Sequence, residues 1–193
     1  MKHLSLILAA ALSLSLAGCS KQEAPAKPEA PVAVSSSSFD LVGTTGKGFT
    51  VGAMMSTQTA YVLFDPQCPH CGHLWQASLP LHAKVRFVWI PVAFNAGKSV
   101  AQAAALLTSA NPADAMSAHE QSLLAGTGGM AASADVPAEL AKSITSNTQL
   151  LNTLGADSVP FILAKNKRTG QVVSNAGALD TPALAALLGL DQP

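Results

Sequence analysis

The feature that most constrains the fold is a pair of cysteines at the junction of a buried strand and a helix. Residues 61–64 form an apolar run, Tyr-Val-Leu-Phe, that is typical of a buried strand. Cys68-Pro69-His70-Cys71 follows, with apolar residues at helical spacing beyond it. Pro69 suits the first turn of a helix, where its missing N–H group is not needed. With a second predicted strand over 85–91, the sequence indicates a βαβ unit.

The rest of the chain extends this unit into an α/β fold with a long helical part. Residues 99–154 are rich in alanine, and three helices are expected there, over 99–110, 111–124 and 137–154. Asn111 and Pro112 suit the N-cap and the first turn of the second helix. Two strands and a last helix follow, at 161–164, 171–174 and 181–188. The helical part therefore separates a βαβ half from a ββα half.

The two cysteines have the placement of a redox pair. The N-terminus of a helix offers unpaired N–H groups and a partial positive charge, which favour a thiolate at Cys68. His70 lies between the cysteines and can stabilise that thiolate further. A thiolate is the nucleophile of disulfide exchange, and a low pKa also makes it a good leaving group. Cys71, one helical turn later, can attack a mixed disulfide formed by Cys68.

Three other uses of the cysteines fit the sequence less well. A zinc site needs two more ligands, and although His73, His82 and His119 are available, a second Cys-x-x-Cys is lacking. Covalent haem attachment needs histidine at position 72, which is glycine. A purely structural disulfide has no use for the strand-to-helix placement. We therefore expect no metal and no cofactor, and we expect the three histidines to be surface or packing residues.

Composition excludes several other classes of protein. Lys+Arg and Asp+Glu balance at 11 each, so the chain lacks the basic excess of a nucleic-acid-binding protein. Charged residues make up 11% and hydrophobic residues 49%, which excludes a disordered chain and indicates a substantial core. The length of 193 residues suits one domain with short appendages.

The N-terminus is typical of an exported protein. Lys2 precedes an apolar run over residues 4–16, which is too short to span a bilayer and suits a signal peptide. The run ends in Leu16-Ala17-Gly18-Cys19, which resembles a bacterial lipobox. We expect residues 1–18 to be removed and Cys19 to be lipidated, against the alternative of an ordinary signal peptide. The lipid would hold the protein at the periplasmic face of a membrane, with the outer membrane favoured over the inner.

The next segment predicts a linker. Residues 19–38 alternate charges with repeated proline and end in four serines, without apolar periodicity. We expect this segment to be a tether, with residues 39–193 as the folded domain.

Beyond these derivations, the chain resembles the bacterial periplasmic disulfide interchange proteins of the DsbC/DsbG type, most of all the DsbG branch. The resemblance is carried by Phe-Asp-Pro-Gln-Cys-Pro-His-Cys at 64–71, by the helical insertion, and by Leu-Gly-Ala-Asp-Ser-Val-Pro at 154–160. It implies a thioredoxin-like fold with the insertion at about 99–154. It also implies that Cys68 is the exposed nucleophile and that Cys71 resolves the mixed disulfide with a client by forming a disulfide with Cys68. Val159 and a cis Pro160 are implied to line a substrate groove. From the residues alone, Pro160 would be a trans proline that begins a strand.

Two departures from this family bear on function. Its members carry an N-terminal dimerisation domain. Cys68 lies only 49 positions after Cys19, which leaves no room for such a domain, so a monomer is expected. The Cys-Pro-His-Cys motif with Val159 before the proline is similar to the related oxidase DsbA. The expected function is thiol–disulfide exchange with cysteine-containing exported proteins, as oxidase, reductase or isomerase, served by a DsbD-like reductant or a DsbB-like oxidant in the membrane. A non-catalytic module that binds unfolded polypeptide or a metal is the alternative.

Overall fold

The centre of the fold is the strand that leads to the cysteines. The computed structural model describes residues 34–95 and 97–191, so the expected signal peptide, Cys19 and most of the expected tether lie outside the described residues. Strand β2 (Thr59–Phe64) lies in the middle of a five-stranded sheet of order β1-β3-β2-β4-β5. The other strands are β1 (Phe49–Gly52), β3 (Arg86–Pro91), β4 (Phe161–Lys165) and β5 (Val172–Ala176).

The direction of the strands places the functional elements at one end of the sheet. β2 and β3 are parallel, and the other neighbouring pairs are antiparallel. α2 (Pro69–Ser78) and the short helix η1 (Leu79–Leu81) connect β2 to β3, as the predicted βαβ unit requires. Because β4 runs against β2, the residues before β4 lie at the same end of the sheet as the residues after β2. The cysteine motif and Pro160 therefore meet there.

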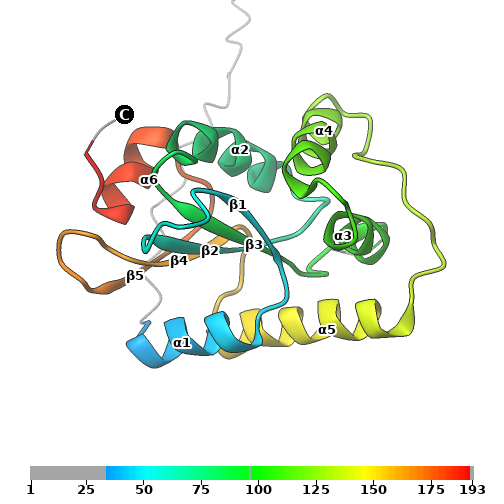
Figure 1. The fold of residues 1–193 in the computed structure, drawn as a ribbon. Helices are drawn as coiled ribbons and strands as arrows, with labels where there is room; N and C mark the ends of the chain where they lie inside the picture. Colours follow the sequence, from blue (N-terminus) through cyan, green and yellow to red (C-terminus); the bar gives the residue numbers. More distant parts are fainter. Residues whose placement is uncertain (1–33, 96, 192–193) are drawn as a thin grey trace, which may run out of the picture.

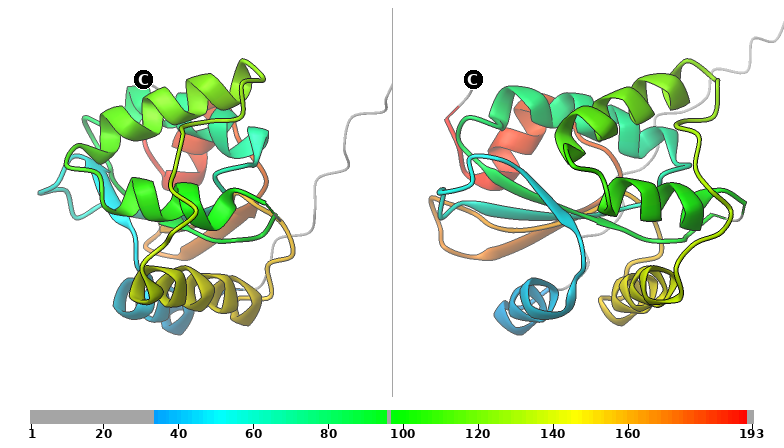
Figure 2. Two further views of the ribbon diagram at one scale, coloured as in Figure 1. Left: turned by 90° about the vertical axis from the view of Figure 1, so that its right-hand side faces the viewer. Right: turned by 45° about the vertical axis from the view of Figure 1, so that its right-hand side comes forward.

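Helices cover both faces of the sheet (Figure 1). α2 and α6 (Thr181–Leu188) lie on one face, with α4 (Pro112–Leu124) packed beside α2. α1 (Ser36–Thr45) and α5 (Ala138–Thr153) lie next to each other on the opposite face, as both views of Figure 2 show. α3 (Ser99–Leu107) packs against α5 and α4.

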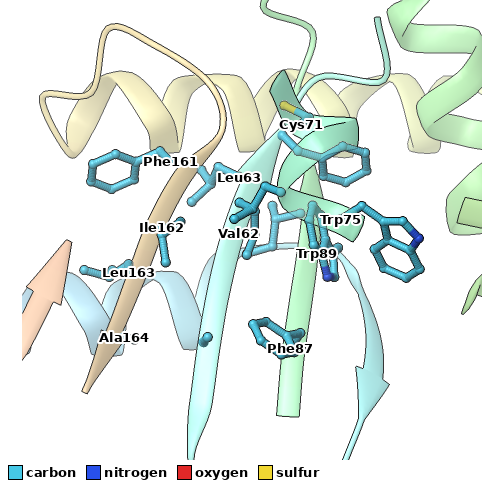
Figure 3. Close-up of a cluster of buried hydrophobic side chains, with 14 of the residues drawn as sticks. Val62, Leu63, Cys71, Trp75, Phe87, Trp89, Phe161, Ile162, Leu163 and Ala164 are labelled. Atoms are coloured by element: carbon cyan, nitrogen blue, oxygen red, sulfur yellow. The ribbon is translucent and has the colours of Figure 1, made fainter. Parts of the chain in front are cut away.

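Aromatic side chains form the core beneath α2. Trp75 of α2 contacts Trp89 of β3, with ring centroids 5.1 Å apart, and Phe64 of β2 meets Trp89 at 5.4 Å. All three rings are fully or almost fully buried. Figure 3 shows Cys71 at one margin of this cluster, on the first turn of α2. Burial of such rings contributes roughly 2 to 3 kcal/mol each, so α2 is firmly seated on the sheet.

The predicted α/β class, both halves of the fold and the helical insertion are confirmed. The expected boundary of the tether differs from the structure, because α1 begins at Ser36. The Ser35 hydroxyl accepts a hydrogen bond from the Ser38 backbone N–H, and the Ser38 side chain accepts one from the Ser35 N–H, so these serines form a helix cap. The helix expected over 99–110 is shorter in the structure and ends at Leu107. Among the described residues, no helix is long and apolar enough to cross a membrane.

Candidate active site

Cys68 is the residue at which α2 begins. Its extended backbone makes it the N-cap, and Pro69 is the first helical residue. The Cys71 N–H donates to the Cys68 carbonyl at 2.9 Å, which closes the first turn and stacks the two cysteines on one face of it. Both are free thiols. The strand-to-helix junction therefore presents a dithiol at the end of the sheet.

The two thiols differ sharply in protonation. The pKa of Cys68 is lowered to about 6, chiefly by a hydrogen bond from the Cys71 thiol, with further contributions from the N–H groups of Cys71 and His70 and from the His70 charge. Burial and the neighbouring Cys68 raise the pKa of Cys71 well above its ordinary value. Cys68 is 7% exposed and Cys71 is not exposed at all. Cys68 is thus the more accessible thiol and a thiolate at neutral pH, although it is more covered than the exposed nucleophile that the resemblance implies.

The carbonyl of Val159 covers Cys68. The Cys68 sulfur lies 3.5 Å from this oxygen, across 91 residues of sequence, and donates a hydrogen bond to it when Cys68 is protonated. The Val159–Pro160 peptide bond is cis, which the resemblance predicts and the residues alone do not. Pro160 leads directly into β4, and its carbonyl accepts a hydrogen bond from Gly177 N–H at 2.8 Å. The βαβ half and the ββα half of the fold therefore meet at the sulfur of Cys68.

Asp65, to which the sequence assigned no role, holds the loop before Cys68. Its carboxylate is completely buried and accepts four hydrogen bonds. Two come from the Gln67 N–H and the Ser99 hydroxyl, at 2.7 and 2.8 Å. The other two come from the N–H groups of Phe94 and Asn95, both at 2.7 Å. One side chain thus ties the cysteine loop to the loop after β3 and to the start of α3.

His119 supports the same loop from α4. Its Nδ1 accepts a hydrogen bond from the Met130 N–H, so its Nε2 carries the proton and donates to the Pro66 carbonyl at 2.7 Å. Burial lowers the pKa of His119, in keeping with a neutral ring. The expectation that His119 is a packing residue is consistent with these contacts. Among residues 34–95 and 97–191, no three histidine, cysteine or acidic side chains form a group that could hold a metal ion.

Glu120 is the second residue that sequence reasoning missed. Both oxygens of its carboxyl group are buried and lack a hydrogen-bond partner. A Cβ atom at Gly72, the residue after Cys71, would lie 2.7 Å from Glu120 Oε2, so a larger residue there would require the Glu120 side chain to move. Burial, and then the negative charges of Cys68 and Asp65, raise the pKa of Glu120 to about 9. A neutral carboxylic acid therefore lies behind the dithiol at neutral pH.

Glu120→Gln is expected to stabilise the chain increasingly as pH rises. The folded state keeps a proton that the unfolded state releases above about pH 4.5, so the wild type loses about 1.4 kcal/mol of unfolding free energy per pH unit between pH 4.5 and 9. Glutamine has the same shape and cannot ionise. In urea unfolding, the difference in unfolding free energy between Glu120→Gln and the wild type should be about 3 kcal/mol larger at pH 7 than at pH 4.5, in favour of the variant. Glu139→Gln, on the exposed side of α5, is the control; equal pH profiles for all three proteins would refute a buried acid at 120.

Comparisons with known proteins agree with this geometry. No family model matches the chain. The chain is 32% identical over 140 residues to the thiol:disulfide interchange protein DsbG of Pseudomonas aeruginosa, covering 72% of this chain and 54% of that protein. It is 34% identical over 109 residues to DsbG of Escherichia coli, covering 55% and 43%. The chain thus spans about half the length of the curated relatives it matches.

Solved structures confirm the fold. A periplasmic thioredoxin-like protein from Salmonella enterica serovar Typhimurium matches with a TM-score of 0.60 at 18% identity, over 81% of this chain and 96% of that one. At this identity the match shows the fold alone. Over the matched residues, which include the dithiol at the start of α2, the chain is similar to the thiol:disulfide interchange proteins of the DsbG type, and it has a thioredoxin-like fold.

Proposed function

We propose that this protein is a thiol–disulfide oxidoreductase that exchanges disulfides with cysteines of client proteins. The observation that carries the proposal is the Cys68 thiol, with its lowered pKa, between the buried Cys71 and the Val159 carbonyl. A pKa of about 6 gives a thiolate-to-thiol ratio of about 10 at pH 7. Cys68 is therefore ionised and ready to attack before any client arrives.

The reaction proceeds in two balanced exchanges. The Cys68 thiolate attacks a client disulfide, a sulfur–sulfur bond forms as the client bond breaks, and the leaving client thiolate takes a proton from solvent. The Cys71 thiol then loses its proton to solvent, and its thiolate attacks the Cys68 sulfur. The Cys68–Cys71 bond forms as the bond between Cys68 and the client breaks, and the second client thiolate leaves and takes a proton from solvent. The client is reduced by two electrons and the protein is oxidised by two. The reverse sequence oxidises a client dithiol.

The residues beside Cys68 provide a place for the client backbone. The carbonyl of Val159 faces the reactive sulfur, and an extended client segment placed along Val159 and Pro160 could donate an N–H group to that oxygen. Pro69 and His70, the exposed first two residues of α2, directly follow Cys68 in the chain. We propose that the client cysteine enters between these two segments.

The direction of exchange depends on the redox partner. The low pKa of Cys68 stabilises the dithiol form, and this favours oxidation of clients. In that direction a DsbB-like oxidant would restore the Cys68–Cys71 disulfide. The DsbG relatives are thiol:disulfide interchange proteins by name. If this chain acts as a reductase or isomerase, a DsbD-like reductant would keep its two cysteines reduced. Trapping the thiols in cells separates the two, since a mainly oxidised pair means an oxidase and a mainly reduced pair a reductase or isomerase.

We further propose that the mature chain is a monomer attached to the periplasmic face of a bacterial membrane, with the outer membrane favoured, through lipid on Cys19. The lipobox-like Leu16-Ala17-Gly18-Cys19 supports the attachment. Radioactive palmitate should label the wild type and leave Cys19→Ala unlabelled. Light scattering of the unlipidated chain from Ser20 onward should give the mass of one chain; the mass of two would overturn the monomer.

Insulin reduction tests the function itself. The reduced protein should accelerate precipitation of insulin B chain in the presence of dithiothreitol, and it should bind no zinc in the same buffer. Zinc binding through the two cysteines, or binding of unfolded polypeptide without any acceleration, would instead support a non-catalytic module.

A further inference from the structure

Positive charge gathers at the end of the sheet opposite to the cysteines. Of the eight lysine and arginine residues in the described part of the chain, five lie there: Lys84, Arg86, Lys165, Lys167 and Arg168. Arg86 pairs with Thr59, the first residue of β2. Ala60 pairs with Ala164 in the antiparallel β4, so Lys165 lies beside Thr59 on the side opposite to Arg86. We call these five residues the cationic end.

The cationic end includes a shallow hollow. Lys84, Lys167 and Arg168 line a hollow of about 450 Å³ together with Gly189, Leu190 and Asp191, so three basic side chains and one acidic side chain share it. The Lys167 N–H donates to the Leu188 carbonyl at 2.9 Å, which fixes the β4–β5 connection against the end of α6. Lys84, Lys167 and Arg168 are exposed. Positively charged groups from two separate segments therefore face solvent together on a rigid support.

Two exposed methionines adjoin these charges. Met54 and Met55, in the connection between β1 and β2, are 58% and 96% exposed. The Ser56 hydroxyl donates to the Lys84 carbonyl at 2.8 Å, which holds the methionine turn against the segment that carries Lys84. Exposed thioether side chains next to lysines and arginines match a surface that is anionic outside and apolar within, which is the chemistry of a phospholipid bilayer.

The chain enters the fold at this same end. α1 begins at Ser36, and the Lys165 ammonium lies 4.7 Å above the ring of Phe39, so the start of α1 adjoins the cationic end. In Figure 1 the start of α1 and the β4–β5 connection both lie at the left. Val34 lies fifteen positions after Cys19, a span of at most about 54 Å in any conformation. The six residues of β2 put the cysteine end about 20 Å farther along the domain.

We propose that the cationic end docks onto an anionic phospholipid surface, with Met54 and Met55 entering the interface and the Cys68–Cys71 pair directed away from the bilayer. The inference rests on the lipid anchor at Cys19 proposed above, because the anchor supplies the membrane within reach. Docking would leave Cys68 accessible to clients from the aqueous side.

Vesicle flotation of the unlipidated chain from Ser20 onward tests this surface without the anchor. The chain should float with vesicles of phosphatidylglycerol and phosphatidylcholine, and it should remain behind with pure phosphatidylcholine or in 0.5 M salt, where charges are screened beyond about 4 Å. Each cation near an anionic surface contributes about fivefold, so Lys167→Glu with Arg168→Glu should lower the partition coefficient at least about 25-fold. Met54→Ser with Met55→Ser should lower it severalfold in low salt.

A matched control separates the cationic end from net charge. Lys47→Glu with Lys142→Glu makes the same change of charge at a surface on α1 and α5, where both residues line another hollow. This control should float like the wild type. Equal loss in both double variants, or equal flotation with neutral vesicles, would overturn the proposal, as would tighter binding to DNA or to an acidic protein. Because every variant keeps the dithiol, an unchanged rate of insulin reduction shows that a failure here leaves the exchange function standing.

Discussion

Replacing Cys71 with serine should convert the protein into a trap for its clients. Cys68 retains its sulfur, and a serine hydroxyl at position 71 can still donate the hydrogen bond that lowers the pKa of Cys68. The first exchange therefore proceeds, but no thiol remains to resolve the mixed disulfide. Non-reducing gels of cells that express this variant should show client adducts that disappear with dithiothreitol.

Cys68→Ser should give the opposite result. Its remaining thiol is buried and has a raised pKa, so it should form almost no adduct and should reduce insulin no faster than buffer. The variant that combines Cys68→Ser with Cys71→Ser is the control for adducts formed through Cys19. Equal trapping by the two single variants would show that the roles assigned to the two cysteines are wrong.

The second large effect concerns the stability of the two redox forms. Because the pKa of folded Cys68 is about 6 and that of the unfolded thiol is about 8.5, the folded dithiol gains stability as pH rises through this window and loses it again as pH falls through 6. The gain is about 1.4 kcal/mol at pH 7 and about 3 kcal/mol at pH 8.5. The disulfide form has no such thiolate, and Glu120 is present in both forms.

Urea unfolding of the two forms at pH 5, 7 and 8 measures this difference. The dithiol should become more stable relative to the disulfide form with each step in pH. A difference that stays constant over this range would show that Cys68 is not ionised preferentially in the folded state, and it would contradict an oxidising disulfide.

The sequence contains the local part of this site. A strand of β-branched and aromatic residues, a proline after the first cysteine, and Asn111-Pro112 each determine structure within a few residues, and the structure contains the β2–α2 junction and the start of α4 that they predict. α1 was missed because serine is a poor helix former in isolation. Its helix depends on the Ser35–Ser38 cap and on burial of Val42, and a run of four serines does not indicate which of them caps a helix.

The remainder of the site is made by contacts between distant segments. Asp65 receives hydrogen bonds from residues 29 to 34 positions later, and His119 reaches the Pro66 carbonyl across 53 positions. Glu120 lies on a helix whose sequence shows no sign of a redox centre. These contacts depend on how the inserted helices pack on α2, which hydrophobic periodicity within each helix does not specify.

The exchange chemistry of this site depends on a Cys68 thiolate at neutral pH, which the Cys71 thiol stabilises by donating a hydrogen bond to it. The ultraviolet absorbance of the thiolate, titrated in the reduced chain from Ser20 onward, tests this most directly. We expect a midpoint near pH 6 in the wild type, a similar midpoint in Cys71→Ser, a clearly higher one in Cys71→Ala, and no thiolate below pH 8 in Cys68→Ser. A wild-type midpoint above pH 8, or the same midpoint in Cys71→Ser and Cys71→Ala, would contradict it.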